Sequence, residues 1–223
     1  IWFAEMMNDP IEAKVALLPD GVLPACDYDL QEVMDTAIGG FIVIDPSGYR
    51  KLSDDNVIMT HMVMSDEKTV VVKAQGGILN PEEVIKAAIE DALEFNISII
   101  GIESVAYQQT LQYWMNKYLI DNKLEYIEVV ELKPGGRKKE LRIIMWFKEI
   151  LSSYYQILGD VRNKILWQAL SYKLGKKDNK DDYLDAGAYG MDMRADHWHS
   201  IISGTRVIQQ TPTHRVVTNN TPF

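Results

Sequence analysis

The chain has 223 residues, of which 47% are hydrophobic and 25% charged, and its formal net charge is −9 at pH 7. These values are typical of a soluble globular protein with one large domain, or with a domain and an appendage. No apolar run approaches the roughly 18 residues that a membrane-spanning helix requires, so we expect no membrane contact. A single cysteine, Cys26, excludes an internal disulfide framework and a cysteine-based zinc site.

The positive charge is concentrated in one segment of the chain. Residues 133–180 contain twelve lysines and arginines against four acids, a surplus of eight, so the remaining residues carry a net charge of −17. A basic segment beside an acidic body is typical of a protein that contacts phosphates with one face, although a solvated helical surface has the same composition. The charge pattern therefore leaves a nucleic-acid partner open.

The first 38 residues differ from the rest and are predicted to be a lead-in or linker segment. The chain starts at Ile1, without a methionine, in a stretch of helical character that ends at Asn8-Asp9-Pro10, because the residue before a proline avoids the α region. This start indicates a fragment excised from a longer protein. We expect the compact domain at residues 39–203 and a loosely ordered tail at residues 204–223.

The pattern from residue 39 to residue 132 alternates strands with helices. Continuous apolar runs predict strands that are buried on both faces, and Asn80-Pro81-Glu82-Glu83 has the cap, the proline and the acids of a helix start. The predicted strands are Phe41–Asp45, Val57–Met64, Thr69–Lys73, Ile97–Glu103 and Ile127–Leu132, and the predicted helices cover residues 81–95 and Gln108–Leu119. The expected fold is α/β, with a mixed sheet of about five strands flanked by helices.

The second half of the chain is predicted to be helical. Two helices are expected over about Lys138–Leu158 and Val161–Leu174, and a last helix over about Asp181–Ser200. Helical spacing favours a place in the core, rather than on a base-stacking surface, for four aromatic residues: Trp146, Tyr154, Tyr155 and Trp167.

Two of the predicted strands end on a carboxylate. Asp45 follows the apolar run from Phe41, and Glu103 ends the run from Ile97. A strand, a crossover helix and a further strand imply parallel pairing, so we expect both acids at the same edge of the sheet. A single acid at a strand end is usually a loop residue, and only a third acidic signal makes this pair informative.

The third signal opens the last predicted helix with Asp181-Asp182-Tyr183-Leu184-Asp185-Ala186. Asp182 and Asp185 are three residues apart and share one helix face, whereas Asp181 points elsewhere. Acids at a helix start are often simple caps, which the helix dipole favours. The small residues after Asp185 argue for more than a cap, because they would let the helix pack closely on a sheet.

Carboxylates that converge in this way are costly unless a cation lies among them. Oxygen ligands suit Mg²⁺ or Mn²⁺. Two such ions about 4 Å apart could activate water and stabilise the leaving oxygen of a phosphodiester, and Asp45 is the best candidate to bridge them. The residues alone therefore predict a metal-dependent phosphodiester hydrolase.

Four short motifs follow one another along residues 2–190. They are Trp2-Phe3-Ala4-Glu5-Met6-Met7-Asn8-Asp9-Pro10, Ile44-Asp45-Pro46-Ser47 with Ser53-Asp54, Ile102-Glu103 before Tyr107, and Lys180-Asp181-Asp182-Tyr183-Leu184-Asp185-Ala186. In this order they resemble motifs of the C-terminal nuclease domain of large terminase subunits, the DNA-packaging motors of tailed bacteriophages. Ser47 stands where that family often has alanine.

The resemblance implies a ribonuclease H-like fold and an endonuclease that cleaves concatemeric double-stranded viral DNA, in which genomes are joined end to end, during genome packaging. It implies Asp45, Glu103 and one acid of the Asp182/Asp185 pair as catalytic ligands of two Mg²⁺ or Mn²⁺ ions, with Asp54 as an auxiliary ligand. We favour both Asp182 and Asp185, because they share a face, and the choice among these acids stays open.

The same resemblance implies the partners and the location. The partners would be double-stranded DNA, an ATPase domain of the same chain, the small terminase subunit and the portal, and the location would be the host cytoplasm, transiently at the procapsid. No G-x-x-x-x-G-K-[ST] motif occurs in the 223 residues, so we expect no ATP hydrolysis by them.

Seven cations of the basic segment are the predicted contacts to DNA phosphates, which are independent of base sequence and weaken with salt. They are Arg137, Lys138, Lys139, Arg142, Lys176, Lys177 and Lys180.

Two other interpretations of the function remain. One is another ribonuclease H-like nuclease, such as a Holliday-junction resolvase, against which Asn8-Asp9-Pro10 argues. The other is a non-catalytic docking module whose acids only cap helices.

Overall fold

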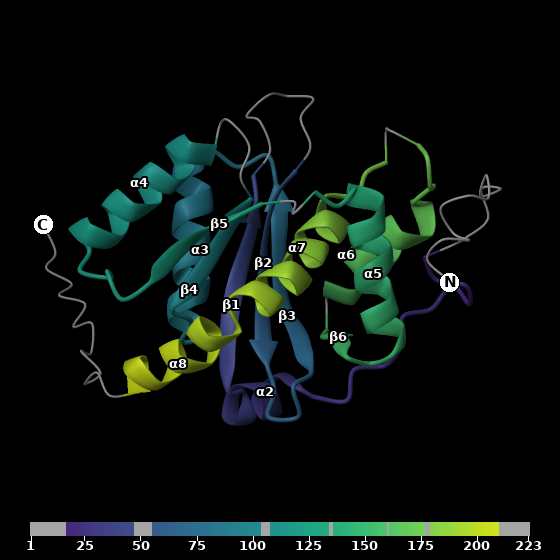
Figure 1. Cartoon of the computed structure of the whole chain (residues 1–223), viewed down its shortest axis with the longest axis horizontal. Coiled ribbons are helices and arrows are strands. Elements are labelled where there is room, and N and C mark those ends of the chain that lie inside the picture. The colour runs from purple at the N-terminus through teal and green to yellow at the C-terminus, as the bar shows by residue number, and fades with distance from the viewer. Residues whose placement is uncertain are drawn as a thin grey trace, which may run out of the picture.

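The computed structural model describes residues 17–46, 55–103, 108–133, 136–159, 161–176 and 179–209, with backbone only at 108, 109 and 205–209. The helix predicted at the N-terminus, and residues 210–223 of the predicted tail, lie outside these residues. A six-stranded sheet in the order β5-β4-β1-β2-β3-β6 forms the centre (Figure 1). No described helix is long and apolar enough to cross a membrane.

The sheet mixes parallel and antiparallel strands, as the sequence predicted. Its strands are β1 (Gly39–Asp45), β2 (Asn56–Val63), β3 (Thr69–Gly77), β4 (Ile99–Glu103), β5 (Glu128–Leu132) and β6 (Tyr155–Ile157). The central strand β1 is antiparallel to β2 and parallel to β4. The predicted parallel pairing of the first strand with the strand that ends at Glu103 is therefore confirmed.

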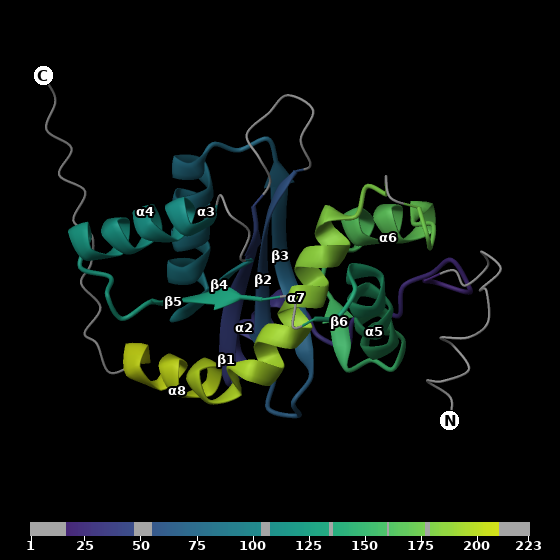
Figure 2. The ribbon, with the colours of Figure 1, turned by 45° about the horizontal axis from the view of Figure 1, so that its top comes forward.

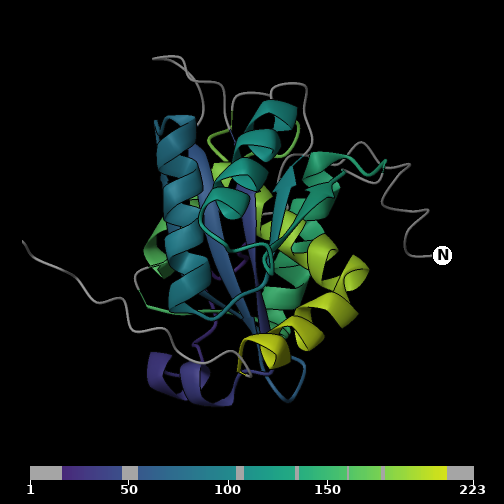
Figure 3. The ribbon, with the colours of Figure 1, turned by 90° about the vertical axis from the view of Figure 1, so that its left-hand side faces the viewer.

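Helices cover both faces of the sheet. They are α2 (Leu30–Thr36), α3 (Pro81–Glu94), α4 (Gln108–Asp121), α5 (Lys139–Leu151), α6 (Val161–Ser171), α7 (Asp182–Asp196) and α8 (Trp198–Gln209). One apolar core lies between the sheet and the α3–α4 layer, and two further clusters join the other face to α5–α8. Figure 3 shows α3 on one side of the sheet and α7 with α8 on the other.

The helix α7 packs closely on its neighbours because of two glycines. A Cβ atom on Gly187 would lie 2.2 Å from the Trp146 ring of α5, and one on Gly190 would lie 2.6 Å from His61 of β2. Both distances are far below a van der Waals contact, so any larger residue would push the helix away. Figure 2 shows α7 running across the sheet from α6 towards α8. Small residues after Asp185 thus allow the close packing that the sequence predicted.

The structure differs from the predicted elements at three places. The helix expected to reach residue 158 ends at Leu151, because Ser153 takes a positive φ of 62°, and the chain then forms the unpredicted strand β6. A short helix, α2, lies within the predicted lead-in and is capped by Asp29, whose side chain accepts a hydrogen bond from the Glu32 amide. The last helix is interrupted at His197 and continues as α8 through Gln209, past residue 203.

The prediction for the four aromatic residues was half right. Trp146 and Tyr155 are completely buried, but Trp167 is 61% exposed and Tyr154 is 55% exposed. Tyr154 directly precedes β6 and Tyr155 begins it, and successive side chains of extended chain point to opposite faces. The helical assignment of both residues was wrong, because α5 ends at Leu151, and the predicted place in the core was wrong for Tyr154 but correct for Tyr155.

Candidate active site

Asp45 and Glu103 lie at the same end of neighbouring strands. The parallel register pairs Ile44 of β1 with Ile102 of β4, so the acid that follows each of them stands at the carboxyl end of the sheet. The two carboxyl groups lie close enough for Glu103 to raise the pKa of Asp45. Two carboxyl groups in such contact need a proton or a cation between them, since two carboxylates repel each other at this distance.

The surroundings of Asp45 disfavour the ionised form of its carboxyl group. The residue keeps some exposed surface, but its carboxyl group is enclosed by the surrounding side chains. Burial, the hydrogen bond to Glu103 and the charges of Glu103 and Asp185 together hold the pKa of Asp45 well above its ordinary value, and Lys139 offsets this only in part. A divalent cation would remove the same unfavourable repulsion.

Helix α7 contributes Asp185 to the same site, and two cations, Lys139 and Arg142, contact this acid. The Arg142 guanidinium donates to Asp185 Oδ1 at 2.7 Å, and Lys139 Nζ lies 3.2 Å from Oδ2 and 2.8 Å from Asp181 Oδ1. Burial opposes the charge on Lys139 and Arg142, yet the charge of Asp185 raises the pKa of both. Asp185 is therefore a carboxylate with both oxygens in ionic contacts.

Tyr189, one helical turn after Asp185, connects the two parts of the site. Its hydroxyl donates to Glu103 Oε1 at 2.5 Å, and the Arg142 guanidinium carbon lies 4.2 Å from the centre of its ring. Burial and the bond to Glu103 raise the pKa of Tyr189, so the phenol stays protonated and keeps its role as donor. Tyr189 and Arg142 thus hold Glu103 and Asp185 in fixed relation.

The remaining acids of α7 lie along the same helix. Asp182 is buried in its first turn, 5% exposed, and Asp181 precedes the helix at 9% exposure. Asp192, seven residues after Asp185, is 3.0 Å from Arg137, while burial raises the pKa of Asp192 despite this cation. Asp181, Asp185 and Asp192 thus each pair with a cation from residues 137–142.

The carboxylate oxygens of Asp45 and Glu103 suit a hard divalent cation, since such ions prefer oxygen ligands. The two acids also follow paired residues of adjacent parallel strands. The side chains are not gathered into a finished metal site, however. Within the described ranges, no group of three or more acidic, histidine or cysteine side chains forms a metal-binding cluster. Asp185, whose charge reaches Asp45, contacts Arg142 and Lys139 instead. Asp54 lies outside the described residues.

The seven cations predicted to contact DNA fall into three groups. Arg137, Lys139 and Arg142 pair with the acids of α7, and Arg142 is only 3% exposed. Lys138, Lys176 and Lys180 are exposed, with Lys180 Nζ 3.4 Å from Asp55. Lys177 lies outside the described residues. Three of the predicted cations, Arg137, Lys139 and Arg142, thus form ion pairs with acids of the site.

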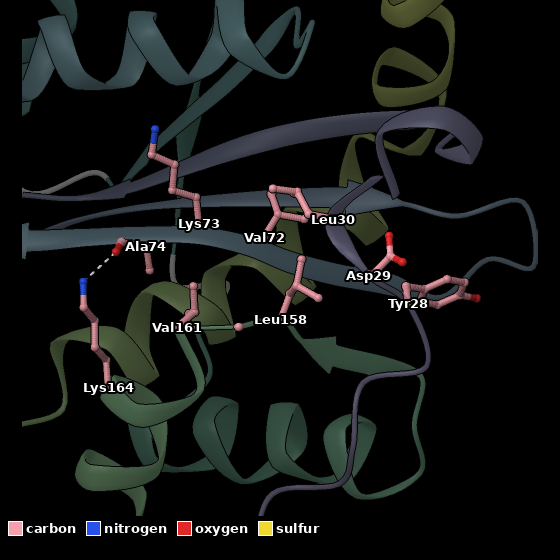
Figure 4. Close-up of a pocket in the computed structure, with 10 residues that line it drawn as sticks. Tyr28, Asp29, Leu30, Val72, Lys73, Ala74, Leu158, Val161 and Lys164 are labelled. Carbon is pink, nitrogen blue, oxygen red and sulfur yellow. Dashed lines mark hydrogen bonds between the residues drawn. The ribbon is translucent and has the colours of Figure 1, made fainter. Parts of the chain in front are cut away.

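A cavity of about 640 Å³ lies away from these acids, between β3, the start of α6 and the start of α2 (Figure 4). Its two lysines already have partners in the protein: Lys164 Nζ donates to the Ala74 carbonyl at 2.8 Å, and Lys73 pairs with Asp91 and Glu94 at 2.7 Å each. The cavity therefore offers no chemistry comparable to that at Asp45.

Sequence reasoning missed Tyr189 and the counter-ion role of Lys139 and Arg142. Helical periodicity could have found Tyr189, which lies four residues after Asp185 and therefore on the same face. Nothing in the sequence reveals that Arg142, 43 residues before Asp185, reaches this acid from another helix.

No protein-family model matches the sequence, and no curated protein matches it either. Among solved structures, the chain is similar to the K428A mutant of gp2c, from the large terminase subunit of bacteriophage Sf6, with calcium. The TM-score is 0.52 at 11% identity, over 70% of this chain and 89% of that one. Together with the mixed sheet and its flanking helices, this similarity defines the fold as ribonuclease H-like.

Two Holliday-junction resolvases give weaker matches. The fowlpox virus enzyme has a TM-score of 0.45 at 12% identity, over 70% of this chain and 98% of its own. The yeast mitochondrial enzyme Ydc2 has a TM-score of 0.44 at 15% identity, over 80% of this chain and 91% of its own.

Proposed function

We propose that this chain is a divalent-metal-dependent endonuclease that cleaves double-stranded viral DNA during genome packaging, as the nuclease domain of a large terminase subunit. The single observation that carries the proposal is the carboxyl pair of Asp45 and Glu103 at the ends of adjacent parallel strands, with the charge of Asp185 close enough to raise the pKa of Asp45. The motif order along the sequence supports the terminase role over other nucleases of this fold.

The residues have separate tasks in this proposal. Asp45 and Glu103 would hold the first cation, and Asp185 and Asp182 of α7 are the acids that we propose for a second. Bound there, the ions supply Lewis-acid activation of water and stabilise the leaving oxygen of the phosphodiester. Arg142 fixes Asp185, Tyr189 fixes Glu103, and the exposed Lys138, Lys176 and Lys180 contact the DNA backbone.

The partners follow from the same proposal. An ATPase domain of the same protein would drive the DNA, and the small terminase subunit and the portal would recruit the motor to the procapsid in the host cytoplasm. The similarity to the Sf6 structure with calcium supports a divalent cation at the acidic site. Mg²⁺ or Mn²⁺ is the ion that we propose, in two positions.

Plasmid cleavage tests the proposal. The purified protein should nick supercoiled plasmid in the presence of Mn²⁺ or Mg²⁺, and Asp45→Asn and Glu103→Gln should each lower the rate at least roughly a thousandfold, as expected when members of one catalytic unit are removed. The matched control is Asp66→Asn, an exposed acid in the turn between β2 and β3 at the opposite end of the sheet, which should cleave normally.

Each alternative has its own outcome in this assay. Cleavage of four-way junctions in preference to linear duplex would replace the packaging role with that of a resolvase. A protein that folds but neither binds Mn²⁺ nor cleaves DNA would be a docking module. Full activity of Asp45→Asn would reject the acidic site itself.

A further inference from the structure

The link between α6 and α7 is strongly basic. Residues 173–180 contain four lysines and one aspartate. Lys173 and Lys176 are exposed, and neither of them pairs with an acid of the described part of the chain. Lys68 shows another arrangement, because in the turn between β2 and β3 it contacts two acids within 3.2 Å. The two lysines of the link are therefore available to an external anion.

One asparagine holds the backbone of both lysines. The Lys176 amide donates to the Lys173 carbonyl at 3.2 Å, which closes a turn. Gly175, the third residue of this turn, has a φ of 75°, which glycine adopts at little cost. The Asn179 side chain accepts from the Lys173 amide at 2.9 Å and donates to the Lys173 and Lys176 carbonyls at 2.8 Å each. Both polar atoms of Asn179 thus serve to fix the turn.

Helix α5 holds the same turn from another side. The Glu140 carboxylate accepts a hydrogen bond from the Gly175 amide at 2.5 Å. Glu140 directly follows Lys139, whose Nζ lies 2.8 Å from Asp181 and 3.2 Å from Asp185. Both α5 and α6 lie beside α7 (Figures 1 and 2). Two successive residues of α5 therefore reach the basic turn and the acids of α7, which fixes the position of the turn relative to these acids.

The turn between α4 and β5 shows a lysine without such support. Lys123 is exposed there, and the neighbouring Asn122 donates one side-chain hydrogen bond, to the Tyr118 carbonyl at 2.8 Å. Holding two like charges in one turn opposes folding, because they repel each other. An anion that contacts both Lys173 and Lys176 would remove this repulsion, and a turn that is ordered before binding loses little entropy when the anion binds.

We propose that Asn179 and Glu140 are positioning residues that hold Lys173 and Lys176 as a clip for phosphates of the DNA backbone. The inference rests on the proposed function and deepens it, because it assigns the residues that fix the backbone of the DNA relative to the acids of α7. Lysine contacts to phosphates do not depend on base sequence, so the clip holds any duplex that reaches the site. Asn179 and Glu140 act through the two lysines and contact neither the DNA nor the ions.

Fluorescence anisotropy with a labelled duplex, in EDTA so that nothing is cleaved, measures the contribution of the clip to DNA binding. The logarithm of the affinity falls with the logarithm of the salt concentration, and the slope counts the phosphate contacts. Lys173→Ala and Lys176→Ala should each reduce this slope by about 1. Asn179→Ala changes no charge, yet it should weaken binding roughly fivefold and reduce the slope, because both lysines lose their fixed position.

Glu140 provides the decisive variants, because charge and positioning predict opposite signs. If only net charge mattered, Glu140→Ala would bind DNA more tightly, since it removes a negative charge. With the clip, Glu140→Ala should bind roughly threefold more weakly, because the turn loses its hydrogen bond to α5. Glu140→Gln keeps an oxygen that can accept from the Gly175 amide, so it should bind at least as tightly as the unmodified chain.

The matched controls lie in the turn between α4 and β5, in the layer on the other face of the sheet. Asn122→Ala removes an asparagine that also bonds to a backbone carbonyl at 2.8 Å, and Lys123→Ala removes an exposed lysine. Both should keep the affinity and the salt slope of the unmodified chain. Circular dichroism checks that each variant is folded, and calorimetric titration should show unchanged Mn²⁺ binding by Asn179→Ala.

The outcomes separate the clip from the proposed function. If the unmodified chain nicks plasmid DNA while Asn179→Ala binds duplex with the same affinity and salt slope, the clip is rejected and the nuclease stands. The clip is also rejected if Glu140→Ala binds DNA more tightly than the unmodified chain. A chain that neither binds nor cleaves DNA would reject the clip and the proposed function together.

Discussion

Two buried carboxylate clusters lie on opposite faces of the sheet, and their partners differ in kind. Asp91 of α3 is completely buried and contacts only donors: Lys73 Nζ at 2.7 Å, Thr60 Oγ1 at 3.0 Å and Gln75 Nε2 at 3.1 Å. Asp45, at the carboxyl end of β1, has two other acids nearby, Glu103 and Asp185, whose charges raise its pKa.

The comparison separates a structural acid from a candidate catalytic one. A buried charge is tolerated when donors satisfy it, and the cluster then fixes the packing of α3 on β2 and β3. Acids that face each other destabilise the fold unless a proton or a cation joins them, which makes such a cluster a candidate functional site. Burial alone does not distinguish the two clusters, but the chemistry of the partners does.

The largest expected effect on stability lies in the structural cluster. Asp91→Ala should lower the free energy of unfolding by about 3 kcal/mol, because it leaves the buried Thr60 hydroxyl and the half-buried Gln75 amide without their acceptor. Urea unfolding followed by circular dichroism measures the change. Glu90→Gln, at an exposed position beside Asp91 that pairs with Lys86 at 4.0 Å, is the matched control and should cost less than about 0.5 kcal/mol.

The comparison would fail if Asp91→Ala were as stable as the unmodified protein. It would also fail if this variant, assayed well below its unfolding temperature, lost DNA cleavage to the same extent as Asp45→Asn. A purely structural cluster should change the fraction of folded protein, and not the rate per folded molecule.

A smaller effect is expected where a donor does serve the candidate catalytic cluster. Tyr189→Phe removes the hydroxyl that donates to Glu103 and should lower stability by about 1.5 kcal/mol, as for a hydrogen bond to a charged group. Calorimetric titration with Mn²⁺ should also show weaker binding, roughly tenfold, because Glu103 then lacks the partner that orients it. Tyr183→Phe, on the same helix, should bind Mn²⁺ unchanged, and equal losses in both variants would contradict the positioning role.

The sequence predicted the placement of Asp45 and Glu103 better than it predicted the partners of Asp185. Strand-end carboxylates and the parallel crossover were enough to bring Asp45 and Glu103 together, because register along a strand follows from simple periodicity. The counter-ions depend on how α5 crosses α7, which is a packing outcome between segments far apart in the chain. Arg142 therefore could be seen as a charge in the sequence, but not as the partner of Asp185.

The same limit explains the missed elements of the fold. The strand β6 has three residues and exists because it pairs with β3 over Thr69–Val71, a contact that no local pattern records. Buried Asp91 falls among the apolar positions of α3, where sequence alone gives no sign of the donors on β2 and β3. Local periodicity thus predicts long elements and their faces, whereas short pairings and buried ion pairs require the assembled molecule.

The smallest expected change in stability has the opposite sign. Asp45→Asn should raise the free energy of unfolding by about 1 kcal/mol near pH 7, because an amide N–H can donate to Glu103 and no second charge has to be buried. An acid whose pKa is raised by folding holds its proton more tightly in the folded state, so its destabilising effect grows as pH rises from the ordinary aspartate value through the raised one. The advantage of the variant should therefore vanish below the ordinary value.

Thermal unfolding across this pH range, with and without Mn²⁺, measures both parts of the prediction. Mn²⁺ should raise the Tm of the unmodified protein, because a ligand that binds only the folded state stabilises it, and should leave the Tm of Asp45→Asn nearly unchanged. Asp66→Asn provides the exposed control, since its carboxyl group lies at the other end of the sheet. A variant that is less stable than the unmodified protein at pH 7 would mean that Asp45 is held by donors, as Asp91 is, and the distinction between the two clusters would be lost.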